Sequence, residues 1–95
     1  QDAVRTIVTE DLDEAYGILD AASFEDGRGG LLVADHRATE TSGRIVRVFP
    51  DGSTETWLEG VGRPGGMALG PDGTVWVVEF VGFGQTGHLI RVPPN

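Results

Sequence analysis

Two carboxylates stand at matching places in this chain, and a histidine follows each of them. Asp35 directly precedes His36, and Glu79 lies a few positions before His88. A carboxylate beside an imidazole can share a proton with it or polarise a water molecule. These four side chains are also candidate ligands for a divalent cation (Ca²⁺, Mg²⁺ or Zn²⁺), because such ions bind carboxylate oxygen and imidazole nitrogen.

The same residues have a structural interpretation as well. If the strands that hold them pair as tight hairpins, Asp35 faces Arg44 and Glu79 faces His88. Cross-strand pairs of this kind stabilise a sheet by roughly 0.2–1 kcal/mol each. A feature that recurs in both halves of a chain usually belongs to the fold, so we favour the structural role.

A second group of candidates lies in the two longest predicted loops, residues 36–42 and 80–86. The first loop is polar, and the second is rich in glycine and aromatic residues. Loops on a rigid scaffold tend to carry binding, so we expect both to contribute to one ligand face. His36 is either a cation ligand shared between copies or a surface residue, and Phe83 either contacts a ligand or packs between repeats. The candidate ligand-binding residues are His36, Glu40, Phe80, Phe83 and Gln85.

An internal repeat places these candidates at equivalent positions. Two blocks share an offset of 44 residues: 31–35 match 75–79, and 43–48 match 87–92. Residues 16–19 also match residues 64–67. A period in this range is typical of architectures in which one supersecondary unit buries its faces against copies of itself.

Strand-like segments follow one another along the chain. Three Asp-Gly pairs lie between apolar runs, and such pairs favour tight hairpin turns because both residues tolerate positive φ. Residues 74–80 are apolar on both faces, which is typical of a strand between two sheets. The predicted strands are residues 3–9, 16–23, 31–36, 44–49, 54–58, 65–69, 74–80 and 88–92.

One segment, residues 11–22, also has a helical pattern. Leu12, Ala15 and Leu19 recur at helical spacing, but Gly17 among them disfavours a helix by about 1 kcal/mol relative to alanine. The match to residues 64–67 favours a strand.

Many short strands and glycine-rich turns in a long repeat predict an all-β propeller. The chain is then a single unit of two circularly permuted four-stranded blades. Residues 1–10 supply an outer strand to a neighbouring blade, residues 11–60 form the first blade, and residues 61–95 form three strands of the second. We expect copies of the chain to exchange residues 3–9, so that a homotrimer closes a six-bladed ring without open sheet edges.

Residues 64–79 (PGGMALGPDGTVWVVE) carry a motif that resembles a known group of propellers. The motif is similar to the six-bladed propellers of the gluconolactonase and senescence-marker-protein group, and to NHL-repeat, strictosidine-synthase-like and streptogramin B lyase proteins. The lactonase resemblance implies hydrolysis of lactones or esters with one divalent cation, held by Glu, Asn and Asp at the mouth of the central channel. Asn95 is the only asparagine, and residues 64–66 lack the acid that the group often has there. We therefore assign no catalytic residue.

Composition narrows the partners. Fifteen acidic and seven basic residues give a net charge of −8, which disfavours nucleic-acid phosphates and anionic membranes. No apolar run approaches the ~20 residues of a membrane-spanning helix, and the lack of cysteine excludes disulfides. The chain opens on Gln1, which a processed export signal and a trimmed chain explain equally well, so the compartment stays open.

Two functions remain. The one we favour is a self-assembling propeller module with a binding or scaffold role and a small-molecule face on its loop rim. The alternative is a metal-assisted hydrolase or lyase of the lactonase type.

Overall fold

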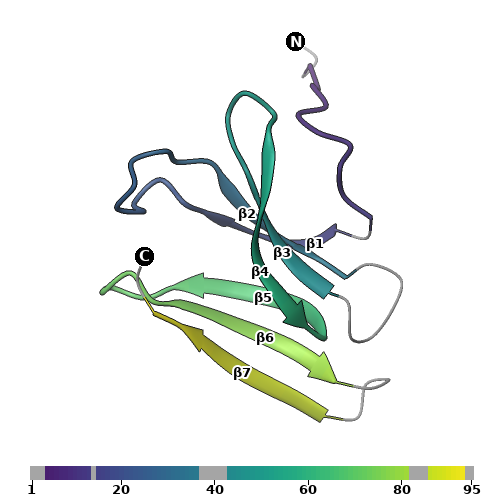
Figure 1. Cartoon of the computed structure of the whole chain (residues 1–95), viewed down its shortest axis with the longest axis vertical. Helices are drawn as coiled ribbons and strands as arrows, with labels where there is room; N and C mark the ends of the chain where they lie inside the picture. Colours follow the sequence, from purple (N-terminus) through teal and green to yellow (C-terminus); the bar gives the residue numbers. More distant parts are fainter. Residues whose placement is uncertain (1–3, 14, 37–42, 82–85, 94–95) are drawn as a thin grey trace.

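The computed structural model of the chain describes residues 4–13, 15–36, 43–81 and 86–93. This part of the chain is all-β, with no helix, and it forms two antiparallel sheets (Figure 1). The first sheet has the order β1-β2-β3-β4 and the second the order β5-β6-β7. The strands are β1 (Ala15–Asp20), β2 (Leu31–Asp35), β3 (Gly43–Val48), β4 (Thr54–Val61), β5 (Arg63–Leu69), β6 (Val75–Val81) and β7 (Thr86–Val92).

Seven of the eight predicted strands are confirmed, although some of their ends differ by a few residues. The strand interpretation of residues 11–22 is confirmed by β1, and the helical one is wrong. Residues 4–10 form no strand in the single chain. Their predicted partner is another copy, so that pairing stays a prediction. No helix of the described residues is long and apolar enough to cross a membrane.

The sequence repeat extends to the pairing of the strands. In the first sheet Leu31 pairs with Val48 and Asp35 with Arg44. Residues 44 positions later, from Val75 to Glu79, pair in the same register with β7. Glu79 therefore faces His88, and both predicted cross-strand pairs are confirmed.

The first strands of the two sheets have a different offset. Ile18 pairs with Val33, and Met67 pairs with Val77, so Met67 is the counterpart of Ile18 at an offset of 49 residues. The sequence match had placed Gly66 opposite Ile18, one residue too early. Both strands carry a bulge just before this point. Glycines have no side chain that could reveal the register of such a segment.

The Asp-Gly pairs form the predicted turns. Gly27, Gly52 and Gly73 have φ values of 70°, 89° and 90°. The preceding aspartates accept hydrogen bonds from the backbone N–H two residues further on, at 2.9–3.0 Å. These local bonds set the turn geometry and leave the flanking strands in register.

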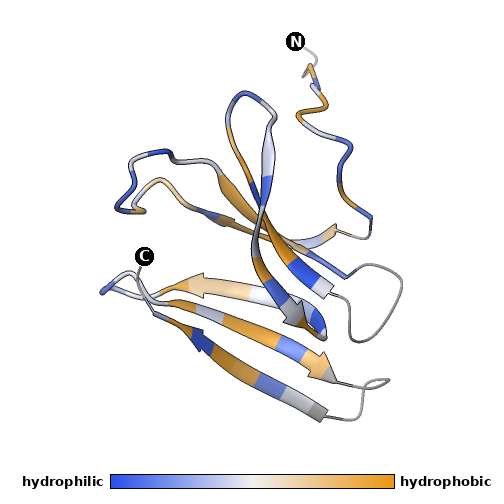
Figure 2. Ribbon diagram, in the orientation of Figure 1, coloured by the Kyte–Doolittle hydropathy of each residue, from blue (hydrophilic) through white to orange (hydrophobic). Residues whose placement is uncertain are grey.

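The two sheets pack through unlike faces. Leu32 and Ile45 of the first sheet share a core with Val75 and Val77 of the second, and Figure 2 shows apolar residues along β2, β3 and β6 where the sheets meet. Trp76, the counterpart of Leu32, is on the opposite face of its sheet and is 37 % exposed. One face of the first sheet therefore packs on the other face of the second.

Candidate functional site

Asp35 is fully buried at the end of β2 and binds two groups. Its Oδ2 accepts a hydrogen bond from Arg44 Nε at 3.0 Å and another from the backbone N–H of Asp13 at 3.3 Å. Arg44 Nη2 donates to the carbonyl oxygen of Asp11 at 2.9 Å. The pair thus fixes the segment that leads into β1.

Glu79 binds the corresponding groups in the second sheet. Its Oε2 accepts a hydrogen bond from the backbone N–H of Gly62 at 2.7 Å, and its Oε1 lies 3.2 Å from His88 Nδ1. Gly62 follows Asp13 by 49 residues, the offset that also relates β1 and β5. Because both carboxylates hold equivalent points of the backbone, their arrangement supports the structural role over acid–base chemistry.

The predicted metal candidates fall into two separate pairs, one at each sheet. Asp35 is next to His36 in the first sheet, and Glu79 contacts His88 in the second. In the described part of the chain, no group of three or more His, Asp or Glu side chains could hold a metal ion. The other ligand candidates Glu40, Phe83 and Gln85 lie outside the described residues.

Two ligand candidates do come together, in a cleft between the sheets. His36 is buried, and its ring stacks on Tyr16 with the centroids 4.0 Å apart and the planes 7° from parallel. Its Nε2 donates a hydrogen bond to the carbonyl oxygen of Pro64 at 2.5 Å, because a carbonyl can only accept. A cleft of about 260 Å³ lies here, and its lining residues are Tyr16, His36, Arg63, Gly65 and Phe80.

The cleft can hold a small planar group, since aromatic rings and a guanidinium line it. Sequence reasoning found His36 and Phe80 but missed Tyr16 and Arg63. These two residues enter through the packing of β1 against β5. No spacing within the sequence reports that packing.

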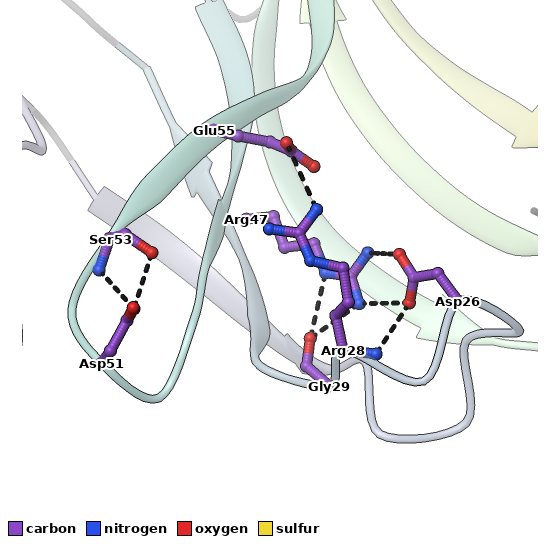
Figure 3. Close-up of polar contacts among 7 residues, drawn as sticks. All are labelled: Asp26, Arg28, Gly29, Arg47, Asp51, Ser53 and Glu55. Carbon is purple, nitrogen blue, oxygen red and sulfur yellow. Dashed lines mark hydrogen bonds and ion pairs between the residues drawn. The ribbon is translucent and has the colours of Figure 1, made fainter.

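A buried arginine forms the other polar cluster, far from any rim (Figure 3). Arg47 is 1 % exposed, and its guanidinium lies 4.9 Å from the ring centroids of both Phe24 and Phe49. Its two terminal nitrogens bind the carboxylate of Asp26 at 2.5 and 2.9 Å, and it also donates to the carbonyl oxygen of Gly29. The Arg47 hydrogen bonds, helped by the backbone N–H of Arg28, lower the pKa of Asp26 to about 2.

This cluster corrects one expectation. The repeated arginines were expected to pair between blades, but Arg47 pairs with the β1–β2 connection of its own sheet. A bidentate, aromatic-lined guanidinium of this kind stabilises the fold and leaves no donor directed at a ligand site.

A scan against protein-family models and searches of curated proteins and solved structures found no match to this chain.

Proposed function

We propose that the protein is a self-assembling β-propeller module in which each sheet is a blade and copies pack head to tail. The observation that carries the proposal is the packing of the two sheets through unlike faces. An interface between unlike faces leaves one copy of each face uncovered, and it generates rings or filaments when repeated.

The two uncovered faces are apolar and equivalent to buried ones. Leu89, on the outer face of the second sheet, is 66 % exposed, whereas its counterpart Ile45 is fully buried. On the outer face of the first sheet, Ile18 is 63 % exposed, whereas its counterpart Met67 packs on the core. Exposed apolar patches of this kind mark interaction sites.

A second copy that repeats the internal contact would cover both faces. Trp76 would take the position that Leu32 has in the single chain, and Leu89 would take that of Ile45. Three copies would give the six blades of the lactonase-like propellers that the sequence resembles, and a closed ring would leave no sheet edge open.

The ligand role rests on the cleft at Tyr16, His36 and Phe80. The cleft lies where two sheets meet, so each further junction between copies would form another. A ring of such clefts on the loop rim would suit a small aromatic molecule. The metal-assisted hydrolase of the lactonase type has no comparable support from the described residues, where no metal-binding group forms.

A matched pair of glycine substitutions tests the head-to-tail packing. A Cβ on Gly17 would lie 2.6 Å from the carbonyl oxygen of Gly65, whereas a Cβ on its counterpart Gly66 would meet nothing within 4 Å. In the assembly, Gly66 would have a neighbouring copy where Gly17 has Gly65. We therefore expect Gly17→Ala to destabilise the fold by about 1–3 kcal/mol, and Gly66→Ala to fold normally but to assemble poorly.

Sedimentation velocity on the unmodified chain and on Gly66→Ala measures the outcome. The proposal expects an oligomer for the first and a shift toward monomer for the second. A monomeric unmodified chain would overturn the assembly. An oligomer that Gly66→Ala leaves unchanged would overturn the head-to-tail geometry.

A further inference from the structure

We infer that residues 5–12 of one copy pair with the outer edge of β7 in the next copy and complete its sheet. This inference rests on the proposed assembly and specifies one of its contacts. In the first sheet β3 lies between β2 and β4. Its counterpart β7 has β6 on one side and no neighbouring strand on the other among the described residues. Such an edge offers unpaired backbone groups to an added strand.

The backbone held by the two carboxylates gives the phase of the added strand. Asp35 binds the N–H of Asp13, and Glu79 binds the N–H of Gly62, 49 residues later. The strand that leads to Gly62 is β4, the outer strand of the first sheet. At the same offset, residues 5–12 lead to Asp13 and are the counterpart of β4. The segment thus occupies the place of an outer strand without a sheet beside it.

The segment has the composition of a strand but none of the contacts. Five of its side chains between residues 4 and 9 are β-branched, which favours extended backbone. In the single chain, however, Val4 is 91 % exposed, and Ile7 and Val8 are also largely exposed. Ordering this segment as a strand therefore needs a sheet edge that the single chain does not supply to it.

An apolar cavity separates the segment from the first sheet. It measures about 550 Å³, and its walls include Ile7, Val8, Leu31 and Val33. Leu31 and Val33 belong to the outer face on which a neighbouring copy would pack. The cavity therefore lies where the β7 edge and its side chains would enter.

The partner edge must come from another copy. Figure 1 places residues 4–13 and β7 at opposite sides of the molecule. The register follows from the first sheet, where Arg47 pairs with Glu55 and Val46 with Thr56. Applying the two offsets predicts that Arg91 pairs with Thr6, and Ile90 with Ile7, of the next copy.

Disulfide crosslinking tests this register directly, because the chain has no cysteine of its own. Thr6→Cys and Arg91→Cys would be prepared as separate full-length proteins, mixed and oxidised. Neither protein can form an intramolecular disulfide. The matched control mixes Thr6→Cys with Ile90→Cys, whose side chain points to the other face of the strand.

We expect a covalent heterodimer, reversible by reductant, as the main oxidised product of the first mixture and its loss in the second. Equal crosslinking in both mixtures, or crosslinking in neither, would overturn the strand pairing. Light scattering on the same samples separates the two proposals. An oligomer without the specific crosslink overturns the pairing alone, whereas a monomer overturns the assembly as well.

Hydrogen exchange provides a second readout in the assembled protein. Ile7→Pro removes a backbone donor from the segment, whereas Ile7→Thr introduces the residue that its counterpart Thr56 already is. We expect amide protection of β7 to be lost in Ile7→Pro and kept in Ile7→Thr. Unchanged protection in both variants would overturn the pairing.

Discussion

The carboxylates of Asp35 and Glu79 hold equivalent points of the backbone in the two sheets. Each accepts a hydrogen bond from the backbone N–H that precedes the first strand of its sheet, Asp13 in one case and Gly62 in the other. Each also faces a basic residue across the hairpin. A sequence pattern that could be taken for acid–base chemistry thus has a complete structural explanation.

Removing these charges should have unequal effects. Asp35→Asn takes the anionic partner from Arg44 in a buried pair, so we expect a loss of about 1–3 kcal/mol in the free energy of unfolding. Glu79→Gln still accepts from Gly62, and His88 is largely exposed, so its loss should stay below about 1 kcal/mol. Urea unfolding of both variants measures the difference. A larger effect of Glu79→Gln would contradict the assignment.

The buried Arg47 should matter far more than the exposed Arg28, although both guanidinium groups lie over Phe49. Arg47→Met loses a bidentate carboxylate and a carbonyl partner, and we expect at least about 2 kcal/mol of destabilisation. Arg28→Met, which loses only a 3.9 Å surface pair with Glu55, should change stability by less than about 0.5 kcal/mol. Thermal and urea unfolding would decide between them, and equal effects would be inconsistent with the cluster in Figure 3.

The Asp26–Arg47 pair should make stability depend on acid pH. The pKa of Asp26 is lowered from 3.8 to about 2, chiefly by Arg47. Its contribution is therefore fully present above about pH 4 and is lost as the pH falls through about 2. We expect the stability gap between the unmodified chain and Asp26→Asn to shrink over this range in urea unfolding. A gap that does not change with pH would argue against the pair.

Tryptophan fluorescence should report the covering of the outer face. The chain has two tryptophans, and Trp76 takes the buried position of Leu32 in the proposed assembly. In a Trp57→Phe protein, emission should move to shorter wavelength as the concentration rises and Trp76 leaves water. The Trp76→Phe protein is the control and should show no such shift. Emission of Trp76 that is independent of concentration, across a range in which the oligomer dissociates, would contradict the packing.

Much of the fold was predictable because the repeat states it twice. The facing of Asp35 with Arg44 follows from a hairpin of matched length, and Glu79 with His88 repeats it. The offset of β5 was not predictable, since Gly65 and Gly66 have no side chains to show a register. The aromatic cleft was found only in part, because Tyr16 reaches His36 through contacts between β1 and β5 that no local pattern encodes.

The packing faces were also beyond the sequence pattern. The strand at residues 74–80 is apolar on both faces, so periodicity cannot say which face meets the first sheet. The burial of Val75 and Val77 and the exposure of Trp76 and Val78 settle this for the single chain. From that asymmetry follows the expectation of a second contact between copies.

Native mass spectrometry of the unmodified chain tests this expectation most directly. The single chain has a mass of 10.1 kDa. The account predicts a discrete oligomer, with three copies as the closed ring, and its dissociation as monomers without bound metal. A folded species of one chain mass at all concentrations would contradict it.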